Sequence, residues 1–370
     1  MELQELRQEI NDIDNEIIEL FKKRMDCSFK VAEYKLENNM EIFQADREDE
    51  IIKRVCEKVP KELENPAKVM FTTLMDISKC KQFQEFFAND DVIEFAPLDL
   101  SAKAKVAVPG TVGSYSHIAS TQFLKNGRTI FFETFDEVFK AVDSGQAKFG
   151  VLPISNSTAG SVVQTYRLMK NYDFKICAET KVTVDHCLAV KPGVKLEDVK
   201  SIYSHEQGIM QCSQFIKKHG FKTHTYSNTS LAAAYIKSSD KPLGAICSKL
   251  CAQEQGLDIL ATGIVDAPEN YTKFMLISKK VLCPENANIV SVSLAVPHTS
   301  SALYRLLTKF SVAGLNLCMI ESMPIANTDF DVIFYLDFEG KITTPDVAKL
   351  INELNSELSY FKFLGNYSQV

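Results

Sequence analysis

Cationic side chains border one face of the helix that the first residues of this 370-residue chain are expected to form. Arg24 stands where a heptad pattern calls for an apolar residue, and Lys35 follows eleven positions later, close to the same face. On most helices such side chains extend into solvent, with the apolar stem lying along the surface. Because Arg24 interrupts the apolar repeat, the pattern favours a functional site beside this helix.

Two further groups of polar residues are spaced so that each lies on one helix face. Gln44, Arg47 and Glu48 are at positions i, i+3 and i+4, and Ser78 and Gln82 are at i and i+4. Each group alone is a weak indication, since exposed helix faces are usually polar. Together with the two cations, however, the groups form a candidate site of cations, amides, a hydroxyl and a carboxylate.

The apolar pattern predicts the helices that must position these residues. Its first repeat, called the apolar seam below, consists of Leu3, Leu6, Ile10, Ile13, Ile17, Leu20, Cys27, Val31 and Tyr34. The seam indicates one long helix with coiled-coil-like spacing. A second helix is expected over about 44–59, ending at Pro60, and a third from about Pro66 to Ala88.

The order of polar residues in positions 1 to about 90 resembles that of the helical chorismate mutase family. The resemblance implies that Lys35 and Gln82 approach the ether oxygen of chorismate, while Glu48 and Gln44 meet its hydroxyl. It implies that the substrate carboxylates are bound, or the site flanked, by Arg7, Arg24, Arg47 and Ser78. A unimolecular rearrangement suits such a site, because it needs only a compact conformer and well-aimed donors.

Helix geometry predicts that this site contains a residue from a second subunit. Arg7 and Arg24 lie about 26 Å apart along a straight helix, so one small substrate cannot touch both in the same chain. Arg7 is therefore expected from a second subunit of a homodimer. Gln44 stands where bacterial members commonly have an acidic residue, although an amide can still bond a hydroxyl. Plain helical dimerisation is the alternative, but Arg24 in the seam argues against it.

Two loops rich in glycine, hydroxyls and amides follow predicted strands, at residues 109–117 and 153–161. Each opens a predicted helix, where free backbone N–H groups favour anions, although most such loops serve only as helix caps. Between about 104 and 280, short β-branched runs alternate with helical patterns, which predicts an α/β domain, possibly of two lobes. Residues 95–105, which contain Pro97, are expected to form a linker before it.

These loops belong to a series of segments that resembles the motifs of prephenate dehydratase in order. The other segments are Asp185-His186-Cys187-Leu188, Tyr203-Ser204-His205, Thr229-Ser230 and Asn270-Tyr271-Thr272-Lys273-Phe274. The resemblance implies two α/β lobes around a cleft and conversion of prephenate to phenylpyruvate without a cofactor. It implies that Thr272 assists the departing hydroxyl as an acid. The residues implied to hold substrate are Ser116, Asn156, Ser157, Thr158 and Lys273.

Two positions depart from that family's pattern. Ser155 replaces a usual Glu, and Lys273 replaces a usual Arg, which keeps the charge but loses the planar fork. Two alternatives therefore stay open. In one, the chain is a monofunctional mutase whose degenerate dehydratase domain binds or senses a ligand. In the other, the central region is a binding protein for a carboxylate ligand.

From about residue 288, the pattern reads strand, helix, strand, strand, helix, strand, which predicts an α+β ferredoxin-like module. With Ala313-Gly314-Leu315-Asn316 between helix and strand, it resembles the ACT domain, which implies phenylalanine as an effector. The residues implied to bind it are Ser301, Ala302, Leu303, Glu321 and Ser322. Met323 replaces a usual Arg, and Ser301 and Tyr304 replace smaller residues, so the sensitivity to phenylalanine stays open.

The bulk composition sets the remaining limits. The length and the motifs predict a multi-domain chain, with an all-α segment at 1–90, an α/β segment at 104–280 and an α+β segment at 288–370. A net charge of -7 disfavours nucleic acid or an anionic membrane as partner. The charged N-terminus predicts no signal or transit peptide. Ten cysteines without a Cys-x-x-Cys pair and six scattered histidines predict a reduced, cytoplasmic protein without a metal.

Overall fold

The computed structural model describes residues 3–38, 40, 45–87, 93–267, 269–325 and 332–370. These residues form two compact units. The first unit comprises residues 1–93 and 292–362, and the second comprises residues 94–291 and 363–370. In the part of the chain so described, no helix has both the length and the apolar character needed to cross a membrane.

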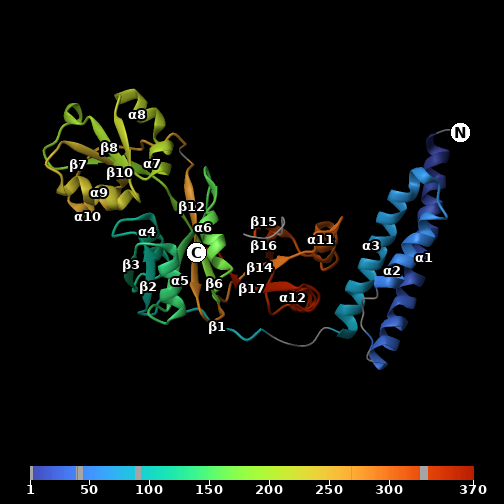
Figure 1. Cartoon of the computed structure of the whole chain (residues 1–370). Helices are drawn as coiled ribbons and strands as arrows, with labels where there is room; N and C mark the ends of the chain where they lie inside the picture. Colours follow the sequence, from blue (N-terminus) through green and yellow to red (C-terminus); the bar gives the residue numbers. More distant parts are fainter. Residues whose placement is uncertain (1–2, 39, 41–44, 88–92, 268, 326–331) are drawn as a thin grey trace. The chain divides into compact units, whose positions relative to one another are not determined.

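The N-terminal segment consists of three helices that pack side by side (Figure 1). They are α1 (Leu3–Glu37), α2 (Ala45–Cys56) and α3 (Glu64–Gln82), and a π-helical turn at Phe83–Phe87 extends α3. Helix α3 begins two residues before the predicted Pro66. A proline in the first turn is tolerated, because an N–H group there would have no partner within the helix.

The apolar seam of α1 is covered by this chain along only part of its length. Ala32 is fully buried, and Lys35 is buried near the end of the helix. From Leu3 to Leu20, in contrast, the seam is exposed, and both of these end residues are 64% exposed. The first half of α1 therefore presents an apolar face that is largely exposed in this chain.

The first lobe of the second unit is built on a mixed sheet of order β3-β2-β4-β12-β6. Its strands are β2 (Lys105–Pro109), β3 (Arg128–Phe132), β4 (Phe149–Asn156), β6 (Lys175–Thr183) and β12 (Tyr271–Ser278). The short strand β5 (Gly160–Ser161) pairs with the end of β4. Its helices are α4 (Tyr115–Phe123), α5 (Phe135–Asp143) and α6 (Val163–Met169). Buried side chains such as Phe149, Cys177 and Phe274 form its core.

The second lobe has a sheet of order β11-β7-β10-β8-β9. Its strands are β7 (His186–Val190), β8 (Ser201–Ser204), β9 (Lys222–Thr225), β10 (Leu243–Ser248) and β11 (Asp258–Thr262). Its helices are α7 (Glu206–Gln211), α8 (Ser213–His219), α9 (Thr229–Ser238) and α10 (Lys249–Gln255). The chain crosses between lobes twice, from β6 to β7 and from β11 to β12. The two lobes expected from the sequence are present.

The C-terminal segment has the predicted order of elements. They are β14 (Ile289–Ala295), α11 (Ala302–Val312), β15 (Leu317–Pro324), β16 (Val332–Glu339), α12 (Pro345–Glu357) and β17 (Tyr360–Tyr367). The four strands form one sheet in the order β15-β16-β14-β17.

The predicted linker is partly ordered as a strand. Within residues 95–105, β1 (Ala96–Pro97) pairs in parallel with β13 (Leu282–Cys283). Two backbone hydrogen bonds beside this pair extend it, from Ala96 N–H to the Val281 carbonyl and from Leu98 N–H to the Cys283 carbonyl. Pairing with a strand that is distant in sequence leaves no local pattern, which is why the sequence predicted a linker alone.

Candidate active sites

Polar side chains predicted on separate helices come together where α1 packs against α3. Arg24 donates from Nη1 to the Leu74 carbonyl at 2.9 Å and to the Ser78 hydroxyl. One turn further along α3, Gln82 donates from Nε2 to the carbonyl and the hydroxyl of Ser28 on α1. Ser78 and Gln82 are both buried. The Arg24 side chain therefore turns out of the seam toward α3.

Lys35 and Glu48 extend this cluster toward α2. Lys35 is 8% exposed. Burial lowers the pKa of its amine, and Lys79 acts in the same direction, whereas the Glu48 carboxylate opposes them. Glu48 accepts from Lys79 Nζ at 2.7 Å and lies 3.4 Å from Arg305 Nη2 of α11. Glu48 is thus held between two cations in addition to its neighbour Lys35.

Lys79 and Arg305 are residues that the sequence patterns did not single out. Both also pair with Asp76, at 3.0 and 2.8 Å, and Asp76 is buried. Lys79 lies next to Ser78 in sequence, which is a faint signal. Arg305 belongs to the C-terminal segment, and its approach to Glu48 and α3 depends on tertiary packing that no local pattern records.

Two other predicted mutase residues, Arg7 and Arg47, lie away from this cluster. The Arg7 side chain is exposed on α1, and Arg47 pairs with Glu50 at 2.8 Å on the surface of α2. Gln44 lies outside the described residues. The structure therefore brings five of the predicted residues together within one chain. They are Arg24, Lys35, Glu48, Ser78 and Gln82.

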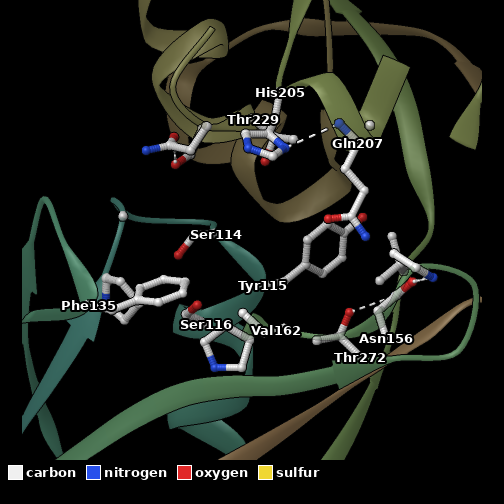
Figure 2. Close-up of a pocket in the computed structure, with 18 of the residues that line it drawn as sticks. Ser114, Tyr115, Ser116, Phe135, Asn156, Val162, His205, Gln207, Thr229 and Thr272 are labelled. Atoms are coloured by element: carbon white, nitrogen blue, oxygen red, sulfur yellow. Dashed lines mark hydrogen bonds between the residues drawn. The ribbon is translucent and has the colours of Figure 1, made fainter. Parts of the chain in front are cut away.

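A second candidate site is a cleft of about 560 Å³ between the lobes of the second unit. Figure 2 shows Ser114 and Ser116 of the first lobe facing His205 and Thr229 of the second. Helices α4 and α9 both begin at this lining, so each directs its first free N–H groups toward the cleft region. None of the described residues that line the cleft is Lys or Arg. An anion here would be bound by N–H and O–H groups.

Glycines shape the loop that opens α4. Gly110 and Gly113 have φ of +96° and +83°, a region that disfavours side chains. A Cβ at Gly113 would lie 2.3 Å from Cys251 Cα on the second lobe, and the Gly113 carbonyl accepts from Ser248 Oγ at 2.6 Å. The loop therefore contacts α10 directly, which fixes the start of α4 against the opposite lobe.

Thr272 and Asn156 form a hydrogen-bonded pair whose direction can be derived (Figure 2). The Asn156 Oδ1 atom accepts from the backbone N–H groups of Thr158 at 3.1 Å and Ala159 at 2.9 Å. This orients the amide so that Nδ2 donates to Thr272 Oγ1 at 3.0 Å. The Thr272 oxygen is thus an acceptor, and its own proton is left for a group in the cleft.

The structure places Lys273 outside the cleft lining, contrary to the substrate-binding role that the resemblance implied. Thr272 and Phe274 line the cleft, whereas Lys273 lies between them on the other face of β12. Its Nζ atom is 3.1 Å from Glu179 Oε1 on the neighbouring strand β6. Glu179 is buried, so this ion pair lies partly within the first lobe.

The remaining predicted dehydratase residues divide into two groups. Ser116 and Asn156 line the cleft. Ser157 and Thr158 do not line the cleft, and their hydroxyls form hydrogen bonds with nearby protein groups instead. Ser157 Oγ bonds the Glu269 carbonyl and the Tyr271 N–H, and Thr158 Oγ1 donates to Asn156 Oδ1 at 2.7 Å. Thr158 therefore supports the Asn156 side chain, and Ser157 joins its loop to the segment that leads into β12.

A chain of side chains missed by the sequence patterns continues from Asn156 to the second lobe. Gln211 Nε2 donates to Thr158 Oγ1 at 3.2 Å and lies 3.5 Å from Asn156 Oδ1. His186 Nε2 is 3.2 Å from Gln211 Oε1, and His186 Nδ1 is 3.2 Å from the Tyr115 hydroxyl. Burial lowers the pKa of His186 to about 4. Tyr115 and His186 belong to segments that resemble prephenate dehydratase motifs, whereas no sequence pattern singled out Gln211.

The predicted effector residues lie on two elements of the C-terminal segment. Ser301 precedes the first residue of α11 with φ of +66°, an uncommon conformation for a non-glycine residue, and Ala302 and Leu303 begin that helix. Glu321 and Ser322 lie on β15.

Comparison with known proteins matches both parts of the chain that hold these sites. The sequence model of the family described as prephenate dehydratase matches residues 106–281, and that of chorismate mutase type II matches residues 6–83. The bifunctional chorismate mutase/prephenate dehydratase of Aquifex aeolicus is 30% identical over 375 residues. The match covers 99% of this chain and 98% of that protein.

Two solved structures resemble the chain with a TM-score of 0.66 each. One is the prephenate dehydratase of Arthrobacter aurescens in complex with L-Phe, which is 29% identical, and the match covers 71% of this chain and 89% of the other. The second is described as GqqA, a novel type of quorum quenching acylase. It is 28% identical, and the match covers 72% of this chain and 98% of the other.

Proposed function

Because the chain belongs to the bifunctional chorismate mutase/prephenate dehydratase family, we propose that the two clusters described above perform its two reactions. The protein rearranges chorismate to prephenate and converts prephenate to phenylpyruvate. This assignment is preferred to a mutase with a degenerate dehydratase domain and to a binding protein for a carboxylate ligand. The assignment of individual residues to each step rests on the geometry of the sites.

For the mutase, the supporting observation is the meeting of Arg24, Lys35, Glu48, Ser78 and Gln82 within one chain. Arg24 with Ser78 binds a substrate carboxylate. Lys35 and Gln82 donate toward the ether oxygen, which gains negative charge as its bond to carbon breaks. Glu48 accepts from the ring hydroxyl. These groups hold the reactive conformer, and no covalent intermediate is required.

We propose a homodimer in which Arg7 reaches the mutase site of the partner subunit. Two observations support it. The apolar seam of α1 is exposed from Leu3 to Leu20, and Arg7 lies on that exposed half of the helix. A second copy of the seam would cover it, as in coiled coils. Burying these side chains would also supply the main driving force for association.

For the dehydratase, the observation that carries the proposal is the hydrogen bond from Asn156 to the oxygen of Thr272. It leaves the Thr272 proton available to the hydroxyl that departs from prephenate. As that C–O bond breaks, the bond to the ring carboxylate also breaks, carbon dioxide leaves, and its electron pair completes the aromatic ring. The N–H groups at the starts of α4 and α9, with Ser116, bind the other charged groups.

Replacement of Thr272 tests this assignment. Thr272→Val keeps the shape of the side chain but removes the proton donor. With chorismate as substrate, this variant should accumulate prephenate while chorismate is consumed at the normal rate. Phenylpyruvate formed at the wild-type rate would show that another group supplies the proton.

We propose that the C-terminal segment is an ACT domain with phenylalanine as its effector. Its order of elements and the L-Phe complex of the Arthrobacter aurescens relative support this. Ser301, Ala302 and Leu303 begin α11, and Arg305 on the same helix pairs with Asp76 and Glu48. An effector that shifts the start of α11 would thereby change the surroundings of a mutase residue.

We propose that the chain divides into domains at 1–90, 104–280 and 288–370. We also propose a cytoplasmic location. The family matches at 6–83 and 106–281 support the first two segments. All ten cysteines are free thiols, eight of them at least partly buried, which fits a reducing compartment. Limited proteolysis and fractionation of the native cells are the direct tests.

A further inference from the structure

We propose that His186 is a positioning residue of the dehydratase, which orients Thr272 through Gln211 and Asn156. The inference rests on the proposed role of Thr272 as proton donor and adds a residue that acts on Thr272 through two amide side chains. Its basis is a continuous series of hydrogen bonds from Tyr115 to Thr272 across both lobes.

The orientation of each group in this series follows from the one before it. The Asn156 amide is fixed by two backbone N–H groups on its oxygen. Gln211 therefore turns its nitrogen toward Asn156 and Thr158, and its oxygen toward His186. An amide oxygen can only accept, so His186 must carry its proton on Nε2. In the neutral ring Nδ1 is then an acceptor, and the Tyr115 hydroxyl donates to it.

All donors in the series consequently point in one direction, from Tyr115 toward Thr272. If the His186 tautomer were reversed, its bare Nε2 would face the Gln211 oxygen, and two acceptors would meet. The Gln211 amide would then have to turn, placing its oxygen against Asn156 Oδ1. An acceptor would then stand against the oxygen that receives the Thr158 and Ala159 N–H groups, and this repulsion would shift Asn156 relative to Thr272.

The same series joins the two lobes. Tyr115 and Asn156 belong to the first lobe, whereas His186 and Gln211 belong to the second. His186 is 2% exposed, and its ring meets the Tyr115 ring edge to face at 5.5 Å. His186 is therefore placed to link the relative position of the lobes with the orientation of the proton donor.

Two substitutions separate this role from simple packing. His186→Gln can place an N–H donor near the position of Nε2, whereas His186→Asn replaces only the nearer Nδ1. With prephenate as substrate, we expect His186→Asn to lower the dehydratase kcat roughly tenfold with little change in KM. His186→Gln should recover most of that loss. Equal kcat values for the two variants, or a loss in KM alone, would overturn the proposal.

Two controls make the result specific. His219→Asn changes a half-buried histidine of the same lobe that bonds the Phe215 carbonyl and does not line the cleft, and it should leave kcat unchanged. Thr272→Val tests the proton donor assignment separately from the positioning role of His186. If Thr272→Val abolishes phenylpyruvate formation and His186→Asn does not lower kcat, only the positioning role fails. If Thr272→Val remains active, the proton donor assignment fails, and the role of His186 fails with it.

A measurement on the unaltered chain covers the case in which a variant does not fold. In protein labelled with ¹⁵N-histidine, the ring nitrogens of His186 should show a neutral ring with the proton on Nε2. The signal of His186 is assigned by its shift in the spectrum of Tyr115→Phe, which removes the hydroxyl beside Nδ1. A proton on Nδ1 would contradict the derived direction of the series.

Discussion

Lys273 and Ser155 are register partners across β12 and β4. The two departures from the prephenate dehydratase pattern thus fall on one cross-strand pair. Lys273 does not face the cleft but pairs with Glu179 on the opposite neighbouring strand. Both departures therefore lie at one place on the sheet, where Ser155 carries no charge and the Lys273 ammonium pairs with Glu179.

This relationship predicts that Lys273 contributes little to substrate binding. Lys273→Met should change the KM for prephenate less than about threefold, because no direct bond to a substrate carboxylate is lost. A charged hydrogen bond to substrate would be worth about 1.5–3 kcal/mol, or roughly a ten- to hundredfold effect. Steady-state kinetics with prephenate distinguish these cases, and an effect of the larger size would return Lys273 to the site.

Thr272→Val should lower the dehydratase kcat by roughly a hundredfold or more, the usual contribution of a positioned general acid. Thr272→Ser keeps the hydroxyl and should retain measurable turnover. Mutase activity of the same samples is the internal control, because the mutase cluster lies in the other compact unit. Loss of both activities together would indicate misfolding rather than removal of the acid.

Complementation between inactive variants tests the proposed dimer. Arg7→Ala and Lys35→Ala should each nearly abolish mutase turnover. When the two are unfolded together and refolded, random pairing makes half the dimers mixed, and one site in each mixed dimer is intact. About a quarter of the wild-type mutase activity should therefore return. No recovery, in a sample shown to contain mixed dimers, would place Arg7 outside the partner's site.

The ion pairs of Arg305 should be measurable in stability. Arg305→Met leaves the buried Asp76 carboxylate with Lys79 alone, and we expect the free energy of unfolding to fall by about 1 kcal/mol or more. Lys22→Met removes an exposed pair with Glu19 and should cost at most a few tenths of 1 kcal/mol. Urea unfolding of both variants gives the comparison. Equal losses would argue against a stabilising contact between α11 and α3.

His186 should make stability depend on pH. Its pKa is about 4 in the folded chain because burial disfavours the charged ring, against about 6.5 when unfolded. Its contribution is therefore complete above pH 6.5 and is lost as the pH falls toward 4. Between pH 7 and 5 the wild type should lose roughly 2 kcal/mol more than His186→Gln. Urea titrations at both pH values measure this, and parallel losses would contradict the buried neutral ring.

The sequence predicted those features that leave a local pattern. The apolar seam predicted α1 as one helix, and Arg24 within it predicted a functional site beside that helix. The alternation of strand residues could also have shown that Lys273 and Thr272 face opposite sides. Gln211 and Arg305 could not be found this way, because their partners lie far away in sequence. The pairing of β1 with β13 was missed for the same reason.

A time course with chorismate tests the central claim most directly. The purified chain is incubated with chorismate at neutral pH, and chorismate, prephenate and phenylpyruvate are separated by chromatography. We predict that chorismate is consumed and that phenylpyruvate forms above a control without enzyme, which requires both sites. Accumulation of prephenate without phenylpyruvate would contradict the second activity, and unchanged chorismate would contradict the first.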